Sequence, residues 1–338
     1  MPDDTRGTPR VTVIIPCHDL GEYLDEAVDS AFAQTEQDFD VIIVDDGSTD
    51  GTTRQVLADY RRPRTRVFRT ENRGLSAARN LATTQTGAEY LCALDADDRL
   101  APACLERSLQ VLDTDRSLAF ASHWVRTFGD EEREWRPERC DLAAVLDMNT
   151  LNGAAVVRRE AVLAVGGWDE SFRDGCEDWD LWLTLLERGY RGTIIPEVLF
   201  HYRRRAGSMS RVMMQGDVHL GVFRQILAKH RESYRRHLPE LTLRREADIA
   251  QLLREIHDLD VDHHRWLVPE IARAREELAA LAAKVARVER ERAREAELAR
   301  LEAAVGALER EVLDLRGSLS WWVTTPLRAV YGWLLKLR

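Results

Sequence analysis

The sequence lacks several features that mark common classes of protein. Its five cysteines form no CxxC pair and have no histidine at zinc-ligand spacing, which argues against a small zinc module and favours a reducing compartment. No run of about eighteen or more apolar residues is present, so no segment is expected to span a bilayer. Residues 1–10 are polar and carry no secretory signal, which predicts a loose leader and a cytoplasmic protein.

Lysine is also rare, and negative charge exceeds positive charge. The formal net charge is −10, and lysine occurs only at Lys229, Lys284 and Lys336. Because phosphate backbones demand a concentrated basic surface, we expect no nucleic-acid partner. With 338 residues, 44% hydrophobic and 31% charged, the chain is long enough for a domain of catalytic size and a second, more charged segment.

Buried strands alternate with helices in the first third of the chain. The continuous apolar runs 11–15 and 39–44 are typical of strands buried on both faces, and the amphipathic segment 21–32 between them completes a βαβ unit. The alternation predicts an α/β sheet. Further helices are expected at 53–60 and 75–84, further strands at 66–69 and 90–94, and a second half of the same sheet from the strand 118–127, the segment 152–158, the turn 166–169 and a helix at 179–188.

Polar segments follow three of the expected strands, at 16–19, 45–48 and 95–98. Ligands of open α/β sheets bind beyond the carboxyl ends of the strands, so these segments are expected to share one cleft. Carboxylates packed together in the segment 95–98 would raise one another's pKa values unless a cation neutralised their charge. A divalent metal bound together with a diphosphate is one interpretation. An ordinary turn or helix cap is the other interpretation.

The C-terminal third is helical in pattern. Apolar stripes predict helices over 217–267, and leucine and valine recur at spacings of three and four between 278 and 315, which is typical of a coiled coil. A solvated single helix is the alternative. The segment 318–338 is aromatic and basic, and Pro326 and Arg328 favour an interfacial helix over a spanning one, with docking on the protein as the alternative.

Four motifs in fixed order carry a family resemblance: VIIP at 13–16, VDDGSTD at 44–50, NRGLSAARN at 72–80 and LDADD at 94–98. Together they strongly resemble the family 2 glycosyltransferases of bacterial surface-polysaccharide type, over about residues 11–210. The resemblance implies a GT-A fold, which is a Rossmann-like mixed sheet with helices on both faces. It also implies an inverting enzyme that uses a nucleotide sugar.

The resemblance assigns roles on the donor side of the cleft. Asp46 should bind the base of the donor, the loop at Pro16 should border the nucleotide, and Arg79 should lie near the sugar diphosphate. Asp97 would be the principal ligand of Mn²⁺ or Mg²⁺. Asp95 would contact ribose or the donor sugar, and Asp98 would assist either carboxylate.

The second half of the resemblance lies on the acceptor side, in GGWDE at 166–170 and GCEDWDLW at 175–182. Asp178 is the candidate general base, because an attacking sugar hydroxyl must lose its proton as the new bond forms. Glu177 and Trp179 would orient it, although both acidic residues are also typical of a helix start. Trp168 is a candidate to stack the acceptor, with core packing as the alternative.

The segment HYRRRAGSMS at 201–210 resembles the motif that closes the family domain. His201 is a candidate second metal ligand. Arg205 occupies the position of the family's histidine, and because arginine cannot ligate a metal it would neutralise the diphosphate directly. Arg203 fits the same phosphate-clamping loop.

These patterns predict a leader at 1–10, a GT-A domain at 11–215, a helical extension at 216–268, a coiled coil at 269–317 and a membrane-associating tail at 318–338. The enzyme would move a sugar from a UDP-, dTDP- or GDP-sugar to a glycan or lipid-linked glycan, as a homo-oligomer on the inner face of the cell membrane. A nucleotidyltransferase and a catalytically weak scaffold organised by the coil are the alternatives.

Overall fold

The computed structural model describes residues 7–205, 208, 216–259, 272–273, 275–280 and 282–283. The chain divides into two compact units, one reaching Val222 and the other starting at Phe223. The expected leader lies mostly outside the described residues, as do most of the coiled coil and the whole tail.

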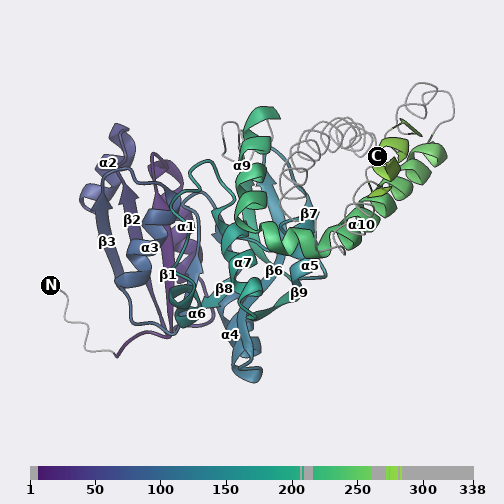
Figure 1. Cartoon of the computed structure of the whole chain (residues 1–338). Coiled ribbons are helices and arrows are strands. Elements are labelled where there is room, and N and C mark those ends of the chain that lie inside the picture. Colours follow the sequence, from purple (N-terminus) through teal and green to yellow (C-terminus); the bar gives the residue numbers. More distant parts are fainter. Residues whose placement is uncertain are drawn as a thin grey trace, which may run out of the picture. The chain divides into compact units, whose positions relative to one another are not determined.

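The first unit begins with parallel strands joined by helices, as the sequence predicts. Strands β1 to β3 lie side by side in Figure 1, and β1 pairs in parallel with both β2 and β4. Every residue of β1 is buried, because a strand in the middle of a parallel sheet is covered on both faces. The elements are β1 (Val11–Cys17), α1 (Gly21–Phe32), β2 (Phe39–Asp46), α2 (Gly51–Ala58), β3 (Thr65–Thr70), α3 (Leu75–Thr84) and β4 (Tyr90–Ala93).

Antiparallel pairs then make the sheet mixed. Strand β8 pairs in an antiparallel way with β4 and β6, while β9 pairs in parallel with β6. Among the described residues the strand order is β3-β2-β1-β4-β8-β6-β9-β5, with β7 paired to β6. The elements are β5 (Arg99–Leu100), α4 (Cys104–Thr114), β6 (Leu118–Gly129), β7 (Glu134–Trp135), α5 (Leu142–Asp147), β8 (Val156–Arg158), α6 (Arg159–Ala164), α7 (Glu177–Glu187) and β9 (Arg191–Arg204).

Strand β9 is the longest of the elements that the sequence pattern does not predict. It contains Pro196, which cannot donate to a ladder and argues against a strand. The structure accommodates the proline at an irregularity: His123 of β6 pairs with Ile195, and the next residue, Trp124, pairs with Val198. Bulges of this kind permit a proline within a sheet.

The second unit is helical where it is described, which agrees with the predicted stripes. Helix α9 (Gly216–Lys229) reaches into it, and α10 (Arg231–Leu259) follows. The rings of Phe223 and Tyr234 pack edge to face, with centroids 6.3 Å apart. Arg275, in the helical residues 275–280, pairs with Glu246 at 2.9 Å. No helix within the described residues is long and apolar enough to cross a membrane.

Glycine at 192 is expected to be essential to the β6–β9 pairing. A Cβ at this position would overlap the ring of Phe120, which is fully buried and packs 5.1 Å from Trp182. We predict that Gly192→Ala lowers the free energy of unfolding by about 1–3 kcal/mol, the usual range for overpacking. Urea denaturation measures this. Gly51→Ala is the control, since nothing lies within 4 Å of its added methyl; an equal loss in both variants would contradict the prediction.

Candidate active site

The two aspartates that end β2 have different tasks. Asp45 is buried and accepts from the backbone N–H of Ser48 and from Nε of Arg69, both at 2.9 Å, so it closes the turn after the strand. Asp46 accepts from the backbone N–H groups of Arg73 and Gly74, both at 2.8 Å. Gly74 has a φ of 94°, which glycine adopts readily. Asp46 thereby fixes the loop that leads into α3.

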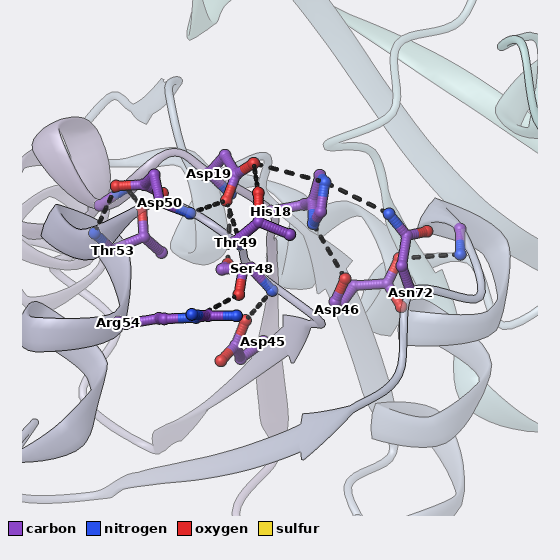
Figure 2. Close-up of polar contacts among 12 residues, drawn as sticks. His18, Asp19, Asp45, Asp46, Ser48, Thr49, Asp50, Thr53, Arg54 and Asn72 are labelled. Atoms are coloured by element: carbon purple, nitrogen blue, oxygen red, sulfur yellow. Dashed lines mark hydrogen bonds and ion pairs between the residues drawn. The ribbon is translucent and has the colours of Figure 1, made fainter.

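The loop after β1 joins the same network, which Figure 2 shows. His18 contacts the carbonyl oxygen of Asp46 through Nδ1 at 3.0 Å and the amide of Asn72 through Nε2 at 3.2 Å. Because a carbonyl only accepts, Nδ1 carries the proton and Nε2 accepts from Asn72. Pro16 is a buried residue of β1 opposite Val44.

Asp19 locks this loop to the one after β2. Its carboxylate accepts from the backbone N–H groups of Thr49 at 2.6 Å and Asp50 at 3.0 Å. These bonds from Asp50 and Thr49 hold the pKa of Asp19 well below its ordinary value. The sequence analysis gave neither Asp19 nor His18 a specific role, although both lie in a strand-end segment that it had placed in the cleft. The loops after β1, β2 and β3 therefore form one braced rim.

The acid turn, residues 95–98, follows β4. The backbone N–H of Asp98 donates to the carbonyl of Asp95 at 3.0 Å, which closes the turn. Asp98 is 1% exposed, and its Oδ1 accepts from the backbone N–H of Arg203 at 2.7 Å, while its buried Oδ2 has no hydrogen-bond partner. Burial raises the pKa of both Asp97 and Asp98, and neighbouring carboxylates add to the rise.

The end of β9 lies against the acid turn. Arg203 donates from Nε to the carbonyl of Asp97 at 2.7 Å, and Arg205 donates from Nε to Oδ2 of Asp97 at 2.8 Å. His201 lies opposite Arg99 in the β5–β9 pair, and burial together with Arg99 and Arg126 lowers its pKa. Two positively charged neighbours do not favour the binding of a metal cation by His201, so its role as a metal ligand stays a prediction. The described residues contain no cluster of three or more metal-ligating side chains.

Arg79 joins the acid turn to helix α7. Its guanidinium donates to Oδ1 of Asp95 at 2.7 Å and to Oε1 of Glu177 at 2.5 Å, and the residue is 1% exposed. Burial alone would lower its pKa, but the carboxylates of Asp95, Glu177 and Asp178 outweigh burial and raise it. The resemblance implied a place near the sugar diphosphate for Arg79. In the structure it is a buried tie between two acidic segments, and contact with a donor stays a prediction.

Asp178 occupies the first turn of α7 and remains partly exposed. Its Oδ1 accepts from the backbone N–H of Trp179 at 2.7 Å, and its Oδ2 accepts from the amide of Asn149 at 3.3 Å. Burial and the neighbouring Glu177 raise the pKa of Asp178 to about 7, against the opposing effect of Arg79. A carboxylate that is accessible and ionises near neutral pH is suited to general-base work.

Gly153 lies beside both Asp178 and Arg79. A Cβ at Gly153 would lie 3.8 Å from Oδ2 of Asp178 and 3.7 Å from a terminal nitrogen of Arg79. Neither Asn149 nor Gly153 was predicted, because an isolated asparagine or glycine in a loop carries no pattern of its own. Both become recognisable only once the chain brings residues 149–153 next to the start of α7.

The candidate tryptophans pack into the protein. Trp168 is 3% exposed and its backbone is held by Asn80, which accepts from its N–H at 2.9 Å and donates to its carbonyl at 2.8 Å. Trp179 is also buried, and its indole N–H donates to the carbonyl of Val145 at 2.7 Å. The burial of Trp168 favours core packing, the alternative left open above, over stacking on an acceptor, and the role of Trp179 in orienting Asp178 stays a prediction.

A mixed α/β sheet with acidic side chains at its strand ends places the protein in the GT-A class of glycosyltransferases. The profile described as "Glycosyl transferase family 2" matches residues 12–169. The putative teichuronic acid biosynthesis glycosyltransferase TuaG of Bacillus subtilis is 31% identical over 216 residues, which cover 61% of this chain and 83% of the relative. Chondroitin synthase of Escherichia coli is 38% identical over 193 residues, 54% of this chain and 27% of that protein.

Solved structures agree on the fold. S. aureus TarS 1–349 in complex with UDP-GlcNAc superposes with a TM-score of 0.54 at 20% identity, over 65% of this chain and 66% of that one. The chain thus spans just under two thirds of the TarS structure. These similarities establish that the chain belongs to glycosyl transferase family 2 and is a glycosyltransferase, which decides against the nucleotidyltransferase alternative.

The buried tie is expected to carry much of the stability of the site. Replacing Arg79 by Met leaves Glu177 buried without its cation, and breaking a buried pair typically costs about 3–5 kcal/mol. We predict a loss of that order for Arg79→Met in urea denaturation. Arg73→Met is the matched control in the loop just before the same helix, because its pair with Glu170 is exposed and worth about 1 kcal/mol or less. Equal losses would show that Arg79 is not such a tie.

Proposed function

We propose that the protein is an inverting, metal-dependent glycosyltransferase that uses a nucleotide sugar. One observation carries this proposal: Arg79 ties the acid turn to the helix that bears Asp178. A donor bound at the strand ends would therefore face a carboxylate suited to deprotonate an acceptor. The two acidic segments are almost 80 residues apart in sequence, so this proximity is a property of the fold.

The donor side would be formed by the braced rim and the acid turn. We place the base near Asp46 and the loop after Pro16, the ribose or sugar near Asp95, and the diphosphate near Arg205. TarS has been solved with UDP-GlcNAc, which supports a nucleotide sugar as the donor class. The Asp46 carboxylate already accepts from two backbone N–H groups and from the hydroxyl of Thr70, but a carboxylate accepts about four hydrogen bonds, so capacity for one base N–H remains.

The acid turn fits a divalent cation. The buried Oδ2 of Asp98 has no partner, and burial disfavours the charged forms of Asp97 and Asp98, so a nearby cation would stabilise both. We propose that Asp97 and Asp98 hold Mn²⁺ or Mg²⁺ together with phosphate oxygens of the donor, an arrangement usual for Mg²⁺. Bound there, the ion would offset the charge of the departing diphosphate.

Asp178 would act as the base of a single displacement. The acceptor hydroxyl loses its proton to Asp178 while its oxygen bonds to the anomeric carbon, and the bond from that carbon to the diphosphate breaks with its electron pair leaving on the phosphate oxygen. Attack opposite the leaving group inverts the anomeric carbon. Asn149, which donates to Oδ2, would hold the carboxylate in position.

The acceptor is proposed from the relatives. Proteins named for teichuronic acid biosynthesis and chondroitin synthesis support a role in polysaccharide biosynthesis, and we propose a glycan or lipid-linked glycan as acceptor. The coil at 269–317 and the tail at 318–338 would assemble the enzyme and attach it to the inner face of the membrane. Both proposals rest on sequence pattern alone, since those segments lie largely outside the described residues.

The first test is release of free nucleoside diphosphate from a panel of UDP-, dTDP- and GDP-sugars with Mn²⁺. We expect one donor to give a signal that Asp97→Ala abolishes, because the charge of the leaving group would no longer be offset. Thermal shift with each nucleotide provides the control for binding. Silence across the panel without stabilisation by any nucleotide would reject the enzyme and favour the scaffold organised by the coil.

The pH profile tests the base. With a pKa of about 7, Asp178 is protonated and inactive in acid, so kcat/KM should fall as the pH drops below about 7 and level off above it. Asp178→Asn should lose about 10²- to 10⁴-fold in kcat/KM and keep its affinity for the donor. The exposed Asp174→Asn, four residues earlier, should change neither the profile nor the rate. An acid limb that survives in Asp178→Asn would exclude Asp178 as its source.

A further inference from the structure

Two arginines from the end of β9 reach the acid turn, and the structure holds them very differently. Arg203 donates to the carbonyl of Asp97 and to Glu26, and its guanidinium lies over the rings of Tyr23 at 4.7 Å and Phe128 at 4.4 Å. Its side chain is 15% exposed. These contacts make Arg203 part of the scaffold under the acid turn, with little freedom to meet a ligand.

Arg205 is held by one strong interaction. Its Nε donates to Oδ2 of Asp97 at 2.8 Å, and its guanidinium lies 5.5 Å from the ring of Tyr23. Its side chain is 27% exposed, nearly twice the fraction of Arg203. Within the part of the chain that the structure describes, Asp97 is the only carboxylate paired with Arg205.

The carboxylate that Arg205 occupies is the one proposed above to hold the metal. A guanidinium and a divalent cation repel each other, so both cannot share Asp97 at close range without cost. A diphosphate brings negative charge to the same place, and arginine binds phosphate oxygens through its planar fork. Arg205 can therefore exchange Asp97 for a diphosphate by giving up one ion pair.

We propose that Arg205 is an internal counter-cation that occupies Asp97 in the absence of donor and moves to the diphosphate when metal and donor bind. This inference rests on the metal and donor sites of the proposed function. Without donor, a metal ion must displace Arg205 from Asp97 and therefore binds weakly. A bound diphosphate draws Arg205 away from Asp97, and its oxygens add ligands to the metal. Metal and nucleotide then bind with positive coupling, and by linkage each raises the affinity for the other by the same factor.

Binding of Mn²⁺ to the full-length protein tests this without any measurement of activity. Free Mn²⁺ is followed by electron paramagnetic resonance, first with protein alone. Arg205→Gln should bind Mn²⁺ about tenfold more tightly than wild type, within the range of about 5- to 150-fold that is common for coupled sites. A variant that merely disturbed the fold would bind metal more weakly. Arg205→Lys, which keeps the charge without the fork, should lie between the two.

A second arm measures the coupling. The titration is repeated with UDP, dTDP and GDP in turn, with a protein-free titration to subtract the metal bound by the nucleotide itself. Wild type should gain more Mn²⁺ affinity from the nucleotide that binds than Arg205→Gln does. Arg204→Gln is the matched control: it removes the same charge from the neighbouring residue, which pairs with Glu131 at 3.8 Å, and should shift Mn²⁺ affinity less than about twofold.

The outcomes separate this inference from the function on which it rests. If Asp97→Asn abolishes Mn²⁺ binding but Arg205→Gln binds no more tightly than wild type, the counter-cation is rejected and the metal site stands. If no protein binds Mn²⁺ with or without nucleotide, the metal part of the proposed function fails and the inference fails with it. Tighter binding in Arg205→Gln together with an unchanged Arg204→Gln supports the inference.

Discussion

The buried guanidinium of Arg79 lies between Asp95 and Glu177, and the active site depends on this pairing. Asp95 belongs to the turn after a parallel strand, and Glu177 opens a helix of the second half of the domain. A single cation, 1% exposed, thus holds together two acidic segments that would otherwise repel each other. The same charge lowers the pKa of the adjacent Asp178, so Arg79 would tune the proposed base as well as position its helix.

Burial raises carboxylate pKa values on both sides of this pairing, with different consequences. In the acid turn it raises the pKa of Asp97 and Asp98 and leaves one carboxylate oxygen without a partner, which creates a demand for positive charge. At the start of α7 it brings the pKa of Asp178 to about 7, the range in which a carboxylate can both take and release a proton near neutral pH. In the proposed function, the same burial thus favours a cation at the acid turn and a base at Asp178.

Much of the fold and part of the candidate site were predictable from the sequence. The buried strands β1, β2 and β4 follow from continuous apolar runs, and the acidic segments at their ends from the family motifs. The tie formed by Arg79 was not predictable, because its partners come from segments distant in sequence and helical spacing alone does not distinguish a buried arginine from a surface one. Asn149, His18 and Asn72 received no role for the same reason: each contacts a segment distant in sequence, so its role is visible only in the folded chain.

Strand β9 shows how an irregularity that hides an element also serves the site. Between the pairs His123–Ile195 and Val125–Phe200, β6 advances two residues while β9 advances five. The three extra residues of β9 lie between Ile195 and Phe200, the stretch that contains Pro196. At about 3.3 Å per residue, they displace the rest of β9 along β6 by about 10 Å relative to a regular pairing. That shift is what allows the backbone of Arg203 to meet Asp98 and the guanidinium of Arg205 to meet Asp97. With a regular pairing these arginines would lie opposite positions about three residues further along β6, about 10 Å from where the structure places them.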